Sequence, residues 1–238
     1  MKTKGNKIVI IVLVILIAIV AVIAVNMLLG LKEENALVKE VEKIEKYLKA
    51  EEIETEKIEI LLKNDLTTGK RLKVEKAIEQ YSLDLAIVLA DTTEVLNDGR
   101  LTSILTTENF KTDGPNFIES KKYITETIEE LEKNKKEIIN LSEKETIMKY
   151  IENDNLNEYY TEFYLSLALG EGMDAADIEE FEEAIDSIIS LVKTSDEILN
   201  LLINNPGTWQ VSGDQVLFSN QEVLNKYQAL TEKIKNNE

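Results

Sequence analysis

The sequence predicts an all-α protein: an N-terminal transmembrane helix followed by an extracytoplasmic antiparallel helical bundle, with one small β-hairpin near the C-terminus. Three observations predict it: a long apolar run near the N-terminus, apolar stripes with helical spacing over most of the remaining chain, and one short alternating stretch near the end. The expected divisions are a cytoplasmic N-terminus at 1–7, a transmembrane signal anchor at 8–29 and an acidic helical-bundle domain at 31–238, which includes a hairpin at 209–218.

The N-terminal apolar run extends from Ile8 to Leu29, and its one polar residue is Asn26. At about 1.5 Å per residue this helix is about 33 Å long, which is enough to cross a hydrocarbon core of about 30 Å. Three lysines precede the run and the first acidic residue follows it, so we expect the N-terminus in the cytoplasm and the rest of the chain outside. A cleaved signal peptide and a buried core helix stay open as alternatives.

The rest of the chain repeats apolar residues at intervals of three and four, which places them on one face of a helix. The longest stripe consists of Val74, Ile78, Tyr81, Leu85, Val88, Thr92 and Val95. Similar stripes lie within 37–48, 124–138, 178–202 and 223–234. Paired apolar positions widen these stripes beyond a coiled-coil seam, so the pattern favours an intramolecular bundle over a coiled-coil dimer.

One short stretch alternates instead of following the helical interval. Apolar residues flank the turn signal Ser212-Gly213-Asp214 at every second position: Trp209 and Val211 before it, Val216 and Phe218 after it. This pattern predicts a β-hairpin. A lone hairpin is marginal in water, so we expect it to pack on the bundle through Trp209 and Phe218.

Two helix starts are predicted from capping pairs. Asn116 with Glu119 follows the turn at Asp113-Gly114-Pro115, and Ser219 with Glu222 follows the hairpin. In such pairs the first side chain accepts a hydrogen bond from a free backbone N–H of the first helical turn.

Composition excludes several classes of chemistry. The chain has no histidine and no cysteine, which removes His- and Cys-dependent catalysis, the usual zinc sites and disulfides. The common glycine-rich nucleotide loops are missing as well. The best calcium candidate, Asn153–Asn157, lacks the Asp, Gly and Glu that an EF-hand loop needs at its first, sixth and twelfth positions. We therefore expect no catalytic residues, no cofactor and no metal site.

The net charge of −18 argues against a nucleic-acid partner, because such partners need clustered Lys and Arg. Aromatic residues are the remaining candidates for binding. They are Tyr159, Tyr160 and Tyr164, which cluster on one predicted helix, and Trp209, the only tryptophan. Aromatic side chains with a polar end suit recognition of peptides or sugars, and they suit a bundle core equally well.

The features together lead us to expect a membrane-tethered extracytoplasmic protein of the bacterial cell envelope, with a non-enzymatic binding or scaffold role. The expected partners are the lipid bilayer, through 8–29, and a protein or cell-wall component. One alternative is an accessory ligand-binding or sensor domain that acts with a separate membrane protein. Another is a carboxylate-dependent hydrolase of wall polymers.

Overall fold

A computed structural model describes residues 32–48, 55–63, 65–169 and 175–236. The apolar run predicted as a membrane anchor lies outside these residues. Within the described ranges, no helix combines the length and the apolar character that crossing a membrane requires.

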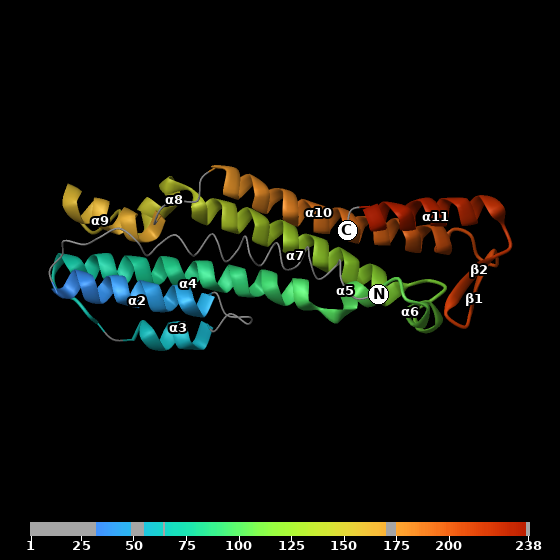
Figure 1. The fold of residues 1–238 in the computed structure, drawn as a ribbon, viewed down its shortest axis with the longest axis horizontal. Coiled ribbons are helices and arrows are strands. Elements are labelled where there is room, and N and C mark those ends of the chain that lie inside the picture. The colour runs from blue at the N-terminus through green and yellow to red at the C-terminus, as the bar shows by residue number, and fades with distance from the viewer. Residues whose placement is uncertain (1–31, 49–54, 64, 170–174, 237–238) are drawn as a thin grey trace. The chain divides into compact units, whose positions relative to one another are not determined.

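The described chain is mostly helical, with one two-stranded antiparallel hairpin near its C-terminus, as the sequence predicts (Figure 1). The elements are α2 (Lys32–Leu48), α3 (Thr55–Leu61), α4 (Lys70–Asn97), α5 (Gly99–Ser103), α6 (Thr107–Thr112), α7 (Ile118–Ser142), α8 (Lys144–Lys149), α9 (Glu158–Leu169), α10 (Ala175–Ile203), β1 (Trp209–Ser212), β2 (Gln215–Phe218) and α11 (Gln221–Asn236).

The stripe predicted for α4 is its buried face. Its first five members, from Val74 to Val88, are at most 5% exposed. Thr92 continues the stripe, and its hydroxyl donates to the Val88 carbonyl oxygen at 2.8 Å, so its one polar group is satisfied. Each buried large aliphatic side chain stabilises the fold by about 1.5–3 kcal/mol. The core position of the stripe therefore explains why this sequence forms a long helix.

The chain divides into two compact units. We call residues 94–133 and 183–236 the hairpin unit, and the described residues within 32–93 and 134–182 the glutamate unit. The unit boundaries fall inside α4, α7 and α10, so each of these helices contributes residues to both units.

In the glutamate unit, α2 lies beside α3 and α4 (Figure 1). Helices α2 and α4 run in the same direction. Glu34 in the first turn of α2 pairs with Arg71 in the first turn of α4, at 2.8 Å, and Glu40 further along α2 lies close to Glu75 and Glu79 further along α4. Helices α2 and α4 are not consecutive, because α3 lies between them in the sequence.

In the hairpin unit, α7 and α10 run in opposite directions. Lys121 near the start of α7 pairs with Asp196 at 2.7 Å, whereas Glu132, further along α7, pairs with the earlier residue Lys193 at 3.3 Å. Helix α11 follows the hairpin and returns along α10, where Lys233 lies 3.8 Å from Glu197.

The hairpin has the predicted bounds and packs on its neighbours, as expected. Trp209 pairs with Phe218 across the strands, and Gly213 in the two-residue turn has a φ of 58°, a conformation that favours glycine. The indole N–H of Trp209 donates to the Leu202 carbonyl oxygen at 2.9 Å, and the Phe218 ring lies 4.9 Å from that of Tyr227. These contacts anchor β1 to the end of α10 and β2 to α11.

For both helix starts, the predicted capping residue is wrong. Helix α11 begins at Gln221, so its cap is Asn220, whose side-chain oxygen accepts from the N–H of Glu222 at 2.9 Å. Ser219 donates to the Thr208 carbonyl oxygen instead.

At α7 the capping group is the carboxylate of Asp113 rather than Asn116. It accepts from the Ser120 N–H at 2.8 Å and from the Ser120 hydroxyl at 2.6 Å. These bonds hold the pKa of the Asp113 carboxyl below its ordinary value, against the opposing effect of burial.

Candidate functional site: a tyrosine pair and a buried carboxylate cluster

The structure brings two of the four predicted binding residues together. Tyr159 and Tyr160 at the start of α9 have ring centroids 5.1 Å apart. Tyr164, on the same helix, is fully buried, and its hydroxyl donates to the Ile147 carbonyl oxygen at 2.9 Å. Burial raises the pKa of its phenol. Tyr164 thus has the geometry of a core residue, while Trp209 belongs to the hairpin unit.

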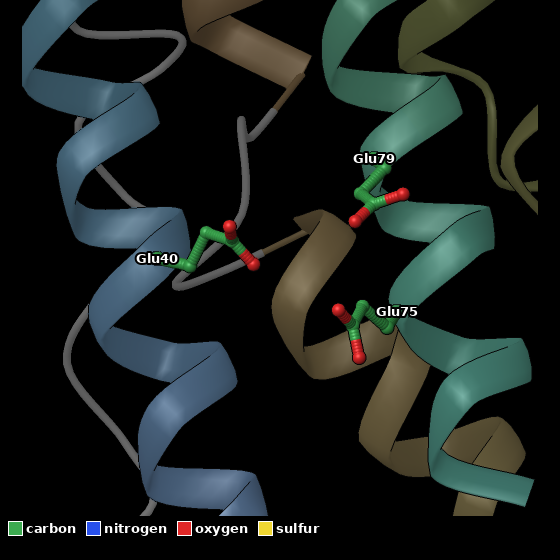
Figure 2. Close-up of side chains that lie close together, drawn as sticks. All are labelled: Glu40, Glu75 and Glu79. Atoms are coloured by element: carbon green, nitrogen blue, oxygen red, sulfur yellow. The ribbon is translucent and has the colours of Figure 1, made fainter. Parts of the chain in front are cut away.

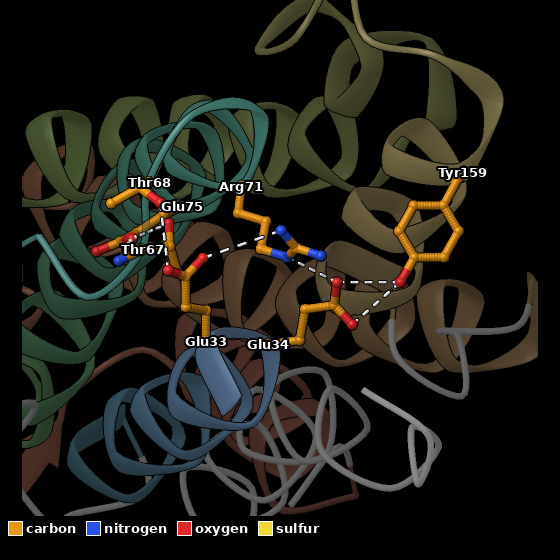
Figure 3. Close-up of polar contacts among 7 residues, drawn as sticks. All are labelled: Glu33, Glu34, Thr67, Thr68, Arg71, Glu75 and Tyr159. Atoms are coloured by element: carbon orange, nitrogen blue, oxygen red, sulfur yellow. Dashed lines mark hydrogen bonds and ion pairs between the residues drawn. The ribbon is translucent and has the colours of Figure 1, made fainter. Parts of the chain in front are cut away.

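Tyr159 is held by Glu34 of α2, which also binds Arg71 of α4 (Figure 3). The Tyr159 hydroxyl donates to both carboxylate oxygens of Glu34, at 3.0 Å each, and Arg71 pairs with the same carboxylate at 2.8 Å. The Arg71 guanidinium also lies 5.7 Å from the centre of the Tyr160 ring. Its hydrogen bond to Glu34 raises the pKa of Arg71, and the same carboxylate raises the pKa of Tyr159. Both groups therefore keep their protons near neutral pH.

Tyr159 is fixed at its hydroxyl and open at its ring. It is 49% exposed, which makes it one of the few large apolar surfaces of the described chain in contact with solvent. A ring that is already oriented loses little conformational freedom when a partner covers it. This tyrosine pair is therefore suited to contact another molecule.

Trp209 lies beside an open groove of about 620 Å³ between the hairpin and the start of α11. The groove is lined by Thr208, Trp209, Val216, Phe218 and Leu224, among others. The indole itself stacks on Phe117 at 5.9 Å and meets Phe110 edge-on at 6.2 Å. Its main contacts are thus internal, and only part of its surface is available to a ligand.

The glutamate unit also contains a carboxylate cluster that the sequence analysis does not anticipate. It consists of Glu40 from α2 with Glu75 and Glu79 from α4 (Figure 2). The three residues are 5%, 0% and 6% exposed, and one carboxylate oxygen from each lies within 4.8 Å of the other two. Buried carboxylates are rare unless they are paired, so this arrangement requires an explanation.

Glu75 is the member of the carboxylate cluster with the most hydrogen bonds. One of its oxygens accepts from the backbone N–H of Leu66 at 2.6 Å. The other accepts from the backbone N–H of Thr67 at 2.8 Å and from the Thr67 hydroxyl at 2.5 Å. The segment that precedes α4 therefore closes over this carboxylate and holds its orientation.

Only one of the two carboxylate oxygens of Glu79 has a hydrogen-bond partner in the described chain. Its Oε2 accepts from the Lys76 ammonium at 2.8 Å, and Lys76 also pairs with Asp65 at 2.7 Å. Burial raises the pKa of Glu79, and the bond to Lys76 opposes that effect. For Lys76 burial acts to lower the pKa, but the hydrogen bonds to Asp65 and Glu79 outweigh it, so its pKa is raised.

Glu40 is the least satisfied member. Its Oε2 is buried without a hydrogen-bond partner among the described residues, and the same holds for Oε1 of Glu79. Burial, reinforced by the charges of Glu75 and Glu79, raises the pKa of Glu40 to about 7, despite the opposing charges of Lys43 and Lys76. Near neutral pH this carboxyl group is therefore poised to take up a proton or a cation.

A signal for these glutamates is present in the sequence. Glu40 lies three residues after Leu37 and four before Ile44, so it belongs to the apolar stripe of α2. Glu75 and Glu79 each follow directly a buried member of the α4 stripe. Acidic residues at, or directly beside, stripe positions of two helices are the pattern that could have indicated this cluster.

In the calcium candidate of the sequence analysis, Asp154 contacts a lysine. The Lys73 ammonium donates to the Asp154 carbonyl oxygen at 2.8 Å and lies 3.6 Å from the Asp154 carboxylate. A lysine thus supplies the positive charge in this loop.

Comparison of the chain with protein-family models, with curated proteins and with solved structures finds no match.

Proposed function

We propose that this protein is a membrane-tethered antiparallel helical-bundle domain of the bacterial cell envelope, with a non-enzymatic binding or scaffold role. Residues 8–29 cross the bilayer, the N-terminus is cytoplasmic, and the described helices are extracytoplasmic. The length and apolar character of 8–29 and the three lysines before it support this topology. The helical architecture supports a binding or scaffold role.

The position of the tyrosine pair carries the proposal of a binding role. Tyr159 contacts Glu34, which follows the last residue of the apolar run, Leu29, by five positions. Five residues span at most about 18 Å at about 3.3–3.6 Å each. If the apolar run crosses the bilayer, the tyrosine pair therefore lies close to the membrane surface, where a second membrane protein is within reach.

The chemistry of this surface favours a protein partner. The chain has a net charge of −18, which repels an anionic membrane surface and nucleic acid alike. Tyrosine and arginine are enriched at the centres of protein interfaces, because each combines a large contact area with polar groups that fix orientation. Tyr159, Tyr160 and Arg71 supply that combination.

The groove beside Trp209 favours the second candidate function, an accessory ligand-binding domain. Its volume of about 620 Å³ is in the range of small-molecule sites, although it is open to solvent. The carboxylate cluster offers no support for a wall-polymer hydrolase, because a sugar chain cannot reach carboxylates that are at most 6% exposed.

Photo-crosslinking in intact membranes tests the binding role. A benzophenone side chain replaces Tyr159 in one variant and Ile60 in a matched control. Ile60 is 58% exposed on α3 of the same unit. We expect a discrete crosslinked protein from position 159 and none from position 60. Identical patterns from the two positions, or no crosslink from either, would remove the tyrosine pair as the binding surface.

Labelling of introduced cysteines tests the topology, since the chain has none of its own. A membrane-impermeant maleimide applied to whole cells should label Ser212→Cys, at the exposed end of β1, and leave Thr3→Cys unlabelled. Labelling of Thr3→Cys, or protection of Ser212→Cys in intact cells with labelling after lysis, would contradict the proposed orientation.

A further inference from the structure

The carboxylate cluster contains two buried oxygens that lack the partners such groups need. Glu40 Oε2 and Glu79 Oε1 have no hydrogen-bond donor within the described part of the chain. Figure 2 shows the Glu40 carboxylate extending from α2 toward the Glu79 and Glu75 carboxylates of α4. Exposed carboxylates satisfy their oxygens with water, whereas residues that are 5% and 6% exposed have little access to it.

The charges of the cluster are also incomplete. Lys76 is the one ammonium in direct contact with the cluster in the ranges that the structure describes, and Asp65 shares it. Three carboxylates with one bound ammonium leave an excess of two negative charges when all three are ionised. A divalent cation supplies the missing charge and the missing partners together.

We propose that Glu40, Glu75 and Glu79 bind one hard divalent cation of the size of Ca²⁺. An all-oxygen set of carboxylates is the donor chemistry that hard cations prefer. This inference goes beyond the proposed binding role and does not depend on the membrane tether.

The spacing of the ligand atoms agrees with a cation of this size. Ca²⁺ binds oxygen at about 2.3–2.6 Å, so ligands on opposite sides of the ion are about 5 Å apart. The three oxygens lie within 4.8 Å of one another, which fits inside this coordination sphere.

Hydrogen bonds from outside the cluster prepare Glu75 to act as a ligand. A carboxylate offers about four lone-pair positions, and the bonds from Leu66 and Thr67 use three of them. The fourth, on Oε1, stays available. Backbone N–H groups that fix a ligating carboxylate in this way are a recurrent feature of metal sites. Glu40 and Glu79 contribute the two oxygens that have no other partner.

A proton is the competing occupant. Glu40 could carry one and donate it to Glu79 Oε1, which would satisfy both free oxygens without a metal. The variant Glu40→Gln distinguishes the two alternatives. Its amide can donate the same hydrogen bond as a protonated Glu40, but it is a poor replacement for a charged metal ligand.

Calcium binding by the full-length protein, extracted in detergent and stripped with a chelator, provides the first test. Calorimetric titration with Ca²⁺ at pH 7.5 should show one site. Glu40→Gln and Glu79→Gln should each weaken it at least about tenfold, as the loss of a ligand requires. Glu59→Gln, an exposed change of equal charge on α3, should bind as the wild type does. Equal affinity in all four proteins would assign the ion to the acidic surface and overturn the proposal.

Thermal unfolding followed by circular dichroism provides the second test. In excess chelator, Glu40→Gln should have the higher Tm, because it removes a buried charge. In Ca²⁺ at about 100 times its dissociation constant, the wild type should gain about 5 °C or more and the variant should not respond. A wild-type Tm that is the same in chelator and in Ca²⁺ would overturn the cation and leave the shared proton as the explanation.

Discussion

The aromatic surroundings of Trp209 and the carboxylate cluster of Glu40 are two regions held together by different interactions. Around Trp209 the rings of Phe110 and Phe117 supply contact area, and the single polar atom of the indole has a carbonyl partner at 2.9 Å. Around Glu40 the side chains are charged, and two buried oxygens have no partner in the described chain. In the first region the polar atom has a hydrogen-bond partner within the protein. In the second region the two unpartnered oxygens can respond to protons or cations from the solution.

This difference predicts which region responds to conditions. Apolar contacts and neutral hydrogen bonds change little with pH or divalent ions. Buried carboxylates change with both, because proton or cation binding alters the energy of the folded state relative to the unfolded state. The hairpin unit should therefore have a constant stability under conditions that shift the stability of the glutamate unit.

Removal of the Trp209 side chain should have the largest effect. Trp209→Ala deletes the stack on Phe117 and the bond to Leu202, and we expect it to destabilise the hairpin unit by about 3–4 kcal/mol. Urea unfolding followed by circular dichroism measures this. Leu217→Ala, on the exposed face of β2 at 43% exposure, is the matched control and should stay within about 0.5 kcal/mol. A red-shifted, freely quenched tryptophan emission in the wild type would contradict the packed position of Trp209.

The pH dependence of Glu40 should have an effect nearly as large. Its pKa is about 7 in the folded chain against an ordinary value of 4.5. Below pH 4.5 the carboxyl is protonated in both states, so its contribution is fully present. As the pH rises through 7 the folded chain must accept a buried charge, and about 3 kcal/mol is lost. The groups that face Glu40 are Glu75, Glu79, Lys43 and Lys76.

Urea unfolding in chelator at pH 5 and pH 8 measures this loss. Glu40→Gln should abolish most of the difference between the two pH values, and Trp209→Ala should leave that difference unchanged. A wild type that is equally stable at both values would show that the cluster relaxes enough to admit water.

The anchoring of Glu75 by Thr67 should have the smallest effect of the three. Thr67→Val keeps the shape of the side chain and the backbone N–H but removes the hydroxyl bond of 2.5 Å, so we expect a loss of about 1–2 kcal/mol. Thr68→Val removes an exposed bond of 3.2 Å to Glu33 and should cost less than about 0.5 kcal/mol. Equal losses for the two changes would mean that Glu75 does not need the hydroxyl.

Apolar periodicity accounts for most of the fold that could be predicted from the sequence. The α4 stripe is buried because a 3-4 interval keeps one face toward the core, and the alternation from Trp209 to Phe218 does the same for a strand. Neither pattern contains information on the direction of neighbouring helices. The parallel arrangement of α2 and α4 is an example, because their stripes would be the same in either direction.

Helix caps were harder to predict because several side chains near a helix start compete for the same N–H groups. At α11 the sequence Ser219-Asn220 offers two capping residues in succession, and the helix begins one residue later than the Ser219 pattern implies. At α7 the carboxylate of Asp113 reaches Ser120 from seven residues away, a distance that no local capping pattern covers.

The prediction missed the carboxylate cluster because it treated every glutamate as a solvent-facing residue, including Glu40 at a stripe position. Glu40, Glu75 and Glu79 lie among many exposed acidic residues of the same type. Their burial depends on the packing of α2 against α4. The tyrosine candidates show the same limit: Tyr159 and Tyr164 are five residues apart on α9, and the packing of the neighbouring helices leaves the first exposed and the second buried.

The long-range partners of α2 have a consequence for synthesis. Glu34 at the start of this helix binds Tyr159, which is 125 residues later in the chain. Translation at about 5–20 residues per second leaves roughly 6–25 s between the appearance of these two residues. During that interval the earliest helix of the described chain lacks part of its final surroundings. Helix α2 therefore reaches its final packing only after α9 has been synthesised.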